Sequence, residues 1–118
     1  MINLHNKQFR ATANSGAGEV DSQTHFTYYQ EGEVVWGTYA GGSIRFGTLT
    51  GIMESSGLLR FAYQHVNQDL QIMTGFCRST PEILTDGRLR LHETWEWTSG
   101  GEGAGQSVIE EIQQHTTP

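Results

Sequence analysis

Strict alternation of apolar and polar residues marks one stretch of the chain, from Gly87 to Thr98. The residues on one side of this alternation are Leu89, Leu91, Glu93, Trp95 and Trp97. A period of two is typical of a β-strand with one buried face. Asp86 and Gly87, which precede the apolar residues, are a hairpin signal because a tight primed turn needs residues that tolerate positive φ. We therefore predict a strand here and use it to orient the faces of the others.

Seven further strands are predicted between stretches rich in turn-forming residues. They cover residues 7–13, 23–30, 33–40, 43–54, 58–67, 70–84 and 107–114. The last of these also fits a short helix, and the sixth strand of the chain is expected to bulge at Pro81, which cannot donate to a ladder. Regularly spaced turns without a long helical period favour an antiparallel meander.

The predicted fold class is therefore all-β, with about eight strands in an up-and-down order. Closing such a meander into a barrel also removes its exposed edges, so we expect a closed, calycin-like β-barrel. A curved open sheet or a small sandwich is the alternative. The chain has 118 residues, which predicts a single domain over residues 1–118.

The register of the hairpins assigns each residue to one of the two faces. Residues directly opposite each other in a hairpin share a face, and we count outward from five tight turns, each taken as a two-residue loop. The predicted inner face carries Phe26, Tyr28, Val35, Tyr39, Ile44, Phe46, Ile52, Leu59, Phe61, Ile72, Phe76, Leu89, Leu91, Trp95 and Trp97. The predicted outer face carries Arg45, Arg60, Gln64, Gln71, Arg88, Arg90 and Glu96, with Trp36, Leu49 and Met53 as apolar exceptions. A slip of one residue would exchange the faces.

Polar groups also fall on the predicted inner face. They are Gln30, Thr48, Thr50, Tyr63, His65, Thr74, Arg78 and Glu93, with the hydroxyls of Tyr28 and Tyr39. A buried polar group without a partner costs about 1–3 kcal/mol, so these groups either satisfy one another or line a wet cavity. Barrels of about eight strands are wide enough to hold one small ligand.

Arg78 and Glu93 form the most specific predicted pair, one step apart on neighbouring strands near Trp95. In one interpretation Arg78 binds a carboxylate or phosphate of a ligand, and Glu93 holds its orientation. In the other, the two form an internal ion pair that no ligand contacts. The tryptophan likewise either stacks on a ligand or fills the core.

Catalysis and metal binding have weaker signals. His65, with Tyr63 nearby, and Glu93 are the candidate proton-transfer residues, although a lone strand histidine also serves as a hydrogen-bonded core residue. The histidines lack the spacing of a metal site, and we expect neither a metal nor a cofactor. Cys77 is assigned to the outer face without a base, so we do not expect a nucleophile.

Charge and cysteine content narrow the partners and the location. The net charge is −6 with seven Lys and Arg, which argues against nucleic acid or an anionic membrane as a partner. The single cysteine excludes an internal disulfide and fits a reducing compartment. No apolar run approaches the ~20 residues of a membrane helix, and no signal peptide is recognised. We expect a cytoplasmic protein.

Five segments together resemble a small family of uncharacterised bacterial proteins, whose members often carry the label N-acetylglutamate synthase. The segments are GTYAGGSI (37–44), GTLTG (47–51), MTGFC (73–77), LHETWEWTSG (91–100) and VIEE (108–111). The resemblance implies acetyl transfer but no particular catalytic residue. In size and topology the predicted barrel also resembles the lipocalin, fatty-acid-binding and avidin group, although the Gly-x-Trp start typical of lipocalins is missing from the first strand.

The function predicted from the sequence is the binding of a small, partly apolar and, through Arg78, anionic ligand inside the barrel. The predicted ligand-binding residues are Arg78, Glu93, Tyr63, His65, Tyr39, Tyr28 and Trp95. One alternative is an enzyme, either the acetyltransferase of the label or a small hydrolase or isomerase. The other is a structural module with a filled core, in which Trp36, Leu49 and Met53 form a homodimer face.

Overall fold

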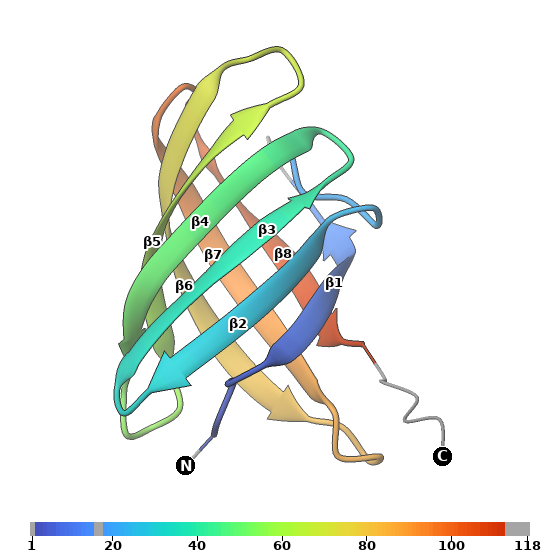
Figure 1. Cartoon of the computed structure of the whole chain (residues 1–118), viewed down its shortest axis with the longest axis vertical. Coiled ribbons are helices and arrows are strands. Elements are labelled where there is room, and N and C mark those ends of the chain that lie inside the picture. The colour runs from blue at the N-terminus through green and yellow to red at the C-terminus, as the bar shows by residue number, and fades with distance from the viewer. Residues whose placement is uncertain (1, 16–17, 113–118) are drawn as a thin grey trace.

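Eight antiparallel strands form a closed barrel in the computed structural model, which describes residues 2–15 and 18–112. Each strand pairs with its neighbours in sequence, and β1 closes the barrel against β8 (Figure 1). The strands are β1 (Lys7–Asn14), β2 (His25–Glu31), β3 (Val34–Gly41), β4 (Ile44–Met53), β5 (Leu59–Asn67), β6 (Ile72–Ile83), β7 (Leu89–Ser99) and β8 (Ala104–Glu111). The prediction of an all-β, up-and-down barrel is confirmed. The described part of the chain has no helix of the length and apolarity that a membrane crossing requires.

The hairpins after β4, β5 and β6 close on the pairs Glu54–Leu58, Asn67–Gln71 and Leu84–Arg88, so each turn loop contains three residues, one more than we predicted. The third residue of each loop has positive φ: 94° at Gly57, 60° at Leu70 and 89° at Gly87. Backbone hydrogen bonds close the loops; for example, the Leu84 N–H donates to Arg88 O, and the Gly87 N–H donates to Leu84 O. A left-handed residue at this position is typical of three-residue hairpins. Between β3 and β4 the register shifts beside Gly41, whose φ is 118°. Each of these features displaces the register by one residue.

Because the one-residue displacements come in pairs, the predicted faces are right for β2, β3, β5 and β7 and wrong for β6 and for β4 from Phe46 onward, whereas Ile44 is buried as predicted. The residues that we placed inside but that lie on the outer face are Phe46, Thr48, Thr50, Ile52, Ile72, Thr74, Phe76 and Arg78. The residues that we placed outside but that are buried inside are Leu49, Met53 and Cys77. The length of the turns explains three of these displacements, and the irregularity beside Gly41 explains the fourth.

The predicted bulge at Pro81 is also wrong, since β6 runs through this residue in regular register with β7. The register shift between these strands lies at Thr74 and Gly75 instead. Pairing of β6 with β5 ends at Ser79. Beyond that point β6 needs ladder hydrogen bonds on one side only, so proline fits there. The last predicted segment is a strand, of which residues 113–114 lie outside the described residues.

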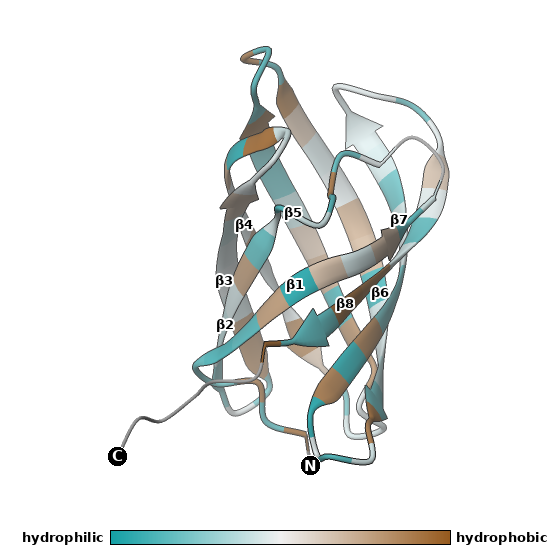
Figure 2. Ribbon diagram, turned by 90° about the vertical axis from the view of Figure 1, so that its right-hand side faces the viewer, coloured by the Kyte–Doolittle hydropathy of each residue, from teal (hydrophilic) through white to brown (hydrophobic). Residues whose placement is uncertain are grey.

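Apolar and hydrophilic residues alternate along the strands (Figure 2), which directs one set of side chains into the barrel. Apolar side chains fill the end at which β1 begins. They are Leu4, Phe9, Val35, Met53, Leu59, Leu89, Leu91 and Ile109, each at most 6% exposed. Polar and aromatic side chains are concentrated toward the other end, and the site lies there.

Candidate functional site

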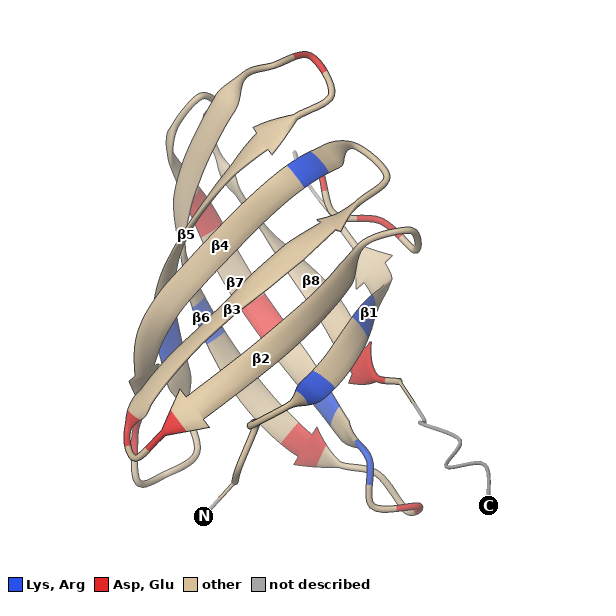
Figure 3. Ribbon diagram, in the orientation of Figure 1, with Lys and Arg blue, Asp and Glu red and all other residues tan. Residues whose placement is uncertain are grey.

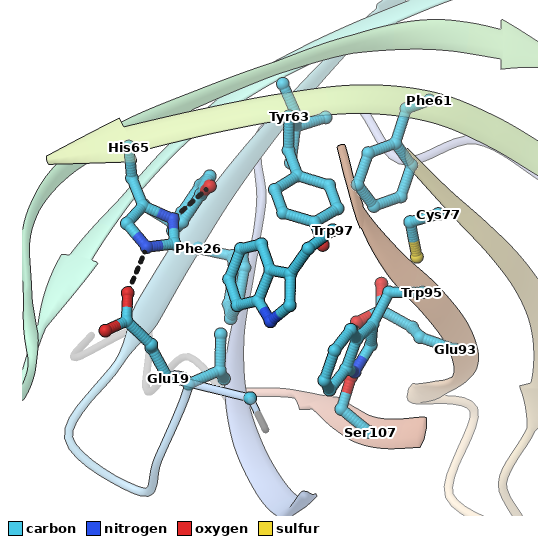
Figure 4. Close-up of a pocket in the computed structure, with 14 residues that line it drawn as sticks. Glu19, Phe26, Phe61, Tyr63, His65, Cys77, Glu93, Trp95, Trp97 and Ser107 are labelled. Atoms are coloured by element: carbon cyan, nitrogen blue, oxygen red, sulfur yellow. Dashed lines mark hydrogen bonds and ion pairs between the residues drawn. The ribbon is translucent and has the colours of Figure 1, made fainter. Parts of the chain in front are cut away.

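A hollow of about 40 Å³ lies inside the barrel, and residues 18–20 of the β1–β2 loop form part of its wall (Figure 4). Its apolar lining consists of Val20, Phe26, Tyr39, Leu49, Phe61, Tyr63, Trp95 and Trp97. Its polar lining consists of Glu19, His65, Cys77, Glu93 and Ser107. This volume corresponds to about three water molecules, and aromatic walls with a few polar groups are typical of ligand pockets.

Glycines opposite the aromatic residues determine how the rings lie. The cross-strand pairs on the inner face are Tyr28 with Gly37, Tyr39 with Gly47, Phe61 with Gly51, Trp97 with Gly75 and Trp95 with Gly105. A Cβ atom on Gly47 would collide with the ring of Tyr39, and one on Gly105 with the indole of Trp95. The missing side chains at Gly47 and Gly105 therefore let the rings of Tyr39 and Trp95 lie against the neighbouring strand.

His65, 4% exposed, joins the β1–β2 loop to the barrel wall. Its Nε2 lies 2.8 Å from Glu19 Oε1, and its Nδ1 lies 2.9 Å from the Tyr39 hydroxyl. Asn67 Nδ2 donates to the other oxygen of Glu19 at 2.9 Å. With Nε2–H donating to the carboxylate, Nδ1 accepts the hydrogen bond of the tyrosine. Burial raises the pKa of Tyr39 well above its usual value, so the hydroxyl remains protonated.

Glu93 is the acidic group deeper in the barrel, 6% exposed, and lies between Ser79 on β6 and Ser107 on β8 in the register. Ser107 Oγ donates to Glu93 Oε1 at 3.1 Å. Among the described residues, Glu93 Oε2 has no hydrogen-bond partner, and neither do the buried hydroxyls of Tyr28 and Ser79. Burial raises the pKa of Glu93 to about 7, against a smaller lowering by the Ser107 hydrogen bond.

The structure brings together Tyr39, Tyr63, His65, Glu93 and Trp95, which all line the hollow as predicted. Tyr28 also points inward, but it is fully buried and is not part of the lining. Whether these residues bind a ligand stays a prediction.

Arg78 does not belong to this group, because it lies exposed on the outer face opposite Arg60 and Thr94. Its predicted pairing with Glu93 is wrong, since the three-residue loop before β6 turns this strand by one residue. As a result, no Lys or Arg is among the described residues that line the hollow.

Sequence reasoning missed three of the polar lining residues, Glu19, Ser107 and Cys77. Glu19 comes from a loop that carries no periodic signal, and Ser107 was not considered because its strand was ambiguous. Cys77 was assigned to the outer face, but it is 2% exposed and burial raises the pKa of its thiol. Ser107 could have been found, because it lies two residues from the apolar Ile109 and so shares its face on a strand.

A closed eight-stranded meander with an aromatic-lined hollow is the type of small barrel that, in lipocalins and streptavidin, holds one ligand. A family model described as "Avidin-like protein" matches residues 2–112. The chain therefore belongs to the avidin-like protein family, which confirms the resemblance to that group of barrels. Comparisons with curated proteins and with solved structures gave no significant match.

Proposed function

We propose that the barrel binds a small, largely apolar molecule in its hollow. The observation that carries this proposal is Glu93 Oε2, a buried and unpartnered carboxylate oxygen in a wall that is otherwise mainly aromatic. Buried polar side-chain atoms are normally hydrogen-bonded, and an exception points to a missing partner. A filled structural core would not need a carboxylate at this position, which argues against the purely structural alternative.

The size of the hollow limits the size of the ligand, unless residues of the lining move. At about 40 Å³ it admits a group of a few heavy atoms without rearrangement. Tyr63, Trp97 and residues 18–20 are the parts of the lining that are only partly buried. A ligand with a ring would displace one of these.

The anionic ligand predicted from the sequence loses its basis, because it depended on Arg78. The enzyme alternatives, acetyl transfer included, stay predictions that the site supports less well than binding. Both ring nitrogens of His65 are engaged, and burial raises the pKa of Tyr39 and Cys77, which disfavours their nucleophilic forms. The cytoplasmic location also stays a prediction.

Native mass spectrometry of the protein purified from its source tests the proposal. We expect an adduct that disappears on denaturation. Ser107→Leu, which fills the hollow, should lose the adduct, and Gln106→Leu, a neighbouring exposed position, should keep it. A bare mass that persists after incubation with biotin, the ligand of streptavidin, and with fatty acids, glutamate and acetyl-CoA would contradict the proposal.

A second candidate function is self-association through the outer face of β3, β4 and β6. Trp36 is 38% exposed, as predicted, and its ring stacks on Tyr29 at 6.0 Å. Leu49 and Met53 are buried, so the other two residues of the predicted homodimer face are wrong. Their place on the surface is taken by Phe46, Ile52, Ile72 and Phe76.

Charged residues are few on these strands, with none on β3, Arg45 on β4, and Arg78 and Glu82 on β6 (Figure 3). Two copies of this face can therefore meet with little like-charge repulsion, as an isologous dimer requires. We therefore propose a homodimer. Sedimentation equilibrium should show that Trp36→Ser weakens it, whereas Ile83→Ser, an exposed apolar residue at the end of β6, should not. A wild-type monomer at every concentration would contradict it.

A further inference from the structure

We propose that the ligand of the hollow carries a protonated amine or a related cationic N–H donor, and that Glu93 binds this group. The inference rests on the proposed function, since it names the class of molecule that the hollow binds. It replaces the acid expected from the sequence with a ligand of the opposite charge.

The charges that line the hollow favour a cation. Two carboxylates, Glu19 and Glu93, line it, and the described lining has no Lys or Arg. Glu19 is engaged by His65 and Asn67 at 2.8 and 2.9 Å. Glu93 has only the Ser107 hydroxyl, so it is the carboxylate with free capacity to accept hydrogen bonds. A buried carboxylate that lacks a counter-charge is unfavourable, and a cationic ligand would supply one.

The free oxygen of Glu93 matches the donors of an ammonium group, which has three N–H bonds and no acceptor. Among the described residues that line the hollow, Glu93 Oε2 is the buried oxygen without a hydrogen-bond partner. Ser79 Oγ and the Tyr28 hydroxyl also lack partners, but both residues are fully buried outside the lining, so they would contact a ligand only after a rearrangement. Trp95 lines the same hollow, and an aromatic ring is a favourable neighbour for a cation.

The pH range in which Glu93 is ionised, and so can bind a cation, depends on its own pKa and on the charges of the titratable groups around it. The other titratable groups that interact with Glu93 are Tyr28 on β2, Tyr39 on β3, Tyr63 on β5 and Cys77 on β6. Burial raises the pKa of all four, so they stay neutral from pH 5 to pH 8. His65 and Glu19 are paired at the mouth. With its pKa raised by burial to about 7, Glu93 is ionised at pH 8 and neutral at pH 5. Amine affinity should therefore rise with pH.

Isothermal titration calorimetry at pH 8 with two matched triplets tests the inference: benzylamine, benzyl alcohol and benzoate, and butylamine, butanol and butyrate. At this pH alkylamines, like Lys, are protonated. In each triplet we expect the amine to bind at least about tenfold more tightly than the alcohol, because hydrogen bonds to charged groups are stronger, and the acid not to bind.

Glu93→Gln should remove the advantage of the amine over the alcohol, and Glu96→Gln, on the outer face of the same strand, should retain it. If Glu93→Gln fails to fold, the wild type still decides, since its amine affinity should fall at least about tenfold from pH 8 to pH 5. An alcohol or acid that binds as tightly as its amine would overturn the inference and leave the proposed function standing. Failure of all six probes would overturn the inference, and together with a bare native mass it would overturn the proposed function as well.

Discussion

Glu93→Gln should make the protein more stable at alkaline pH, by an amount that follows from the burial of this carboxyl group. Because the folded-state pKa is raised, folding disfavours ionisation. The stability that the neutral form provides is complete below the ordinary pKa of 4.5 and is lost as pH rises to about 7. The span from 4.5 to about 7, at about 1.4 kcal/mol per pH unit, gives a loss of about 3 kcal/mol. Glutamine cannot ionise and avoids this loss.

Urea denaturation followed by far-ultraviolet circular dichroism at pH 5, 6, 7 and 8 measures the effect. The unfolding free energy of Glu93→Gln relative to wild type should increase by about 2–3 kcal/mol from pH 5 to pH 8. Any constant effect of the amide on packing cancels in this comparison. Glu96→Gln removes the same charge from the outer face of β7 and should show almost no pH-dependent difference. Parallel stability profiles for Glu93→Gln and wild type would refute the reasoning.

Three further results are expected. Glu19→Gln, which disrupts the hydrogen bonds of a partly buried carboxylate to His65 and Asn67 on β5, should lower the unfolding free energy by about 1–2 kcal/mol in urea denaturation, whereas the exposed Glu33→Gln should not; equal effects would count against this contact. Leu70→Gly should raise the unfolding free energy by about 0.5–1 kcal/mol because it relieves a positive φ, and Gln68→Gly in the same loop should lower it; a lower urea midpoint for Leu70→Gly would contradict the left-handed conformation. Cys77 should react with a thiol reagent at least about a hundredfold more slowly in the native protein than in urea, because it is buried and its pKa is raised; rapid native labelling would show that the hollow is open to reagents.

The strands were predictable because the period of two is maintained along almost every one of them. The faces of β4 and β6 were not, because loops of two and three residues draw on the same residue types. Gly57 and Gly87 suit either loop, and Leu70 at positive φ gives no local signal at all. The rule that apolar residues face inward would not have corrected the register either, because the correct register leaves Phe46 and Ile72 exposed to solvent.

The site was predictable where it lies on β5 and β7, the strands whose faces were right. His65 and Glu93 were found in this way, and Arg78 was misplaced by the same arithmetic on β6. Glu19 could not be found, because a loop residue meets β5 only through the closure of the barrel. The predicted charge of a barrel interior is therefore more sensitive to a register error than its predicted apolar character. Here the displacement of one arginine reversed the predicted charge of the ligand.

Nuclear magnetic resonance of the three tryptophan indole N–H groups tests the central claim, that the hollow binds a small molecule, most directly. Trp95 and Trp97 line the hollow, and Trp36 lies on the outer face, so it serves as an internal control. On addition of benzylamine at pH 8, or of the ligand that copurifies, the signals of Trp95 and Trp97 should shift and saturate while that of Trp36 stays in place. No shift at saturation, or a shift confined to Trp36, would contradict binding inside the barrel.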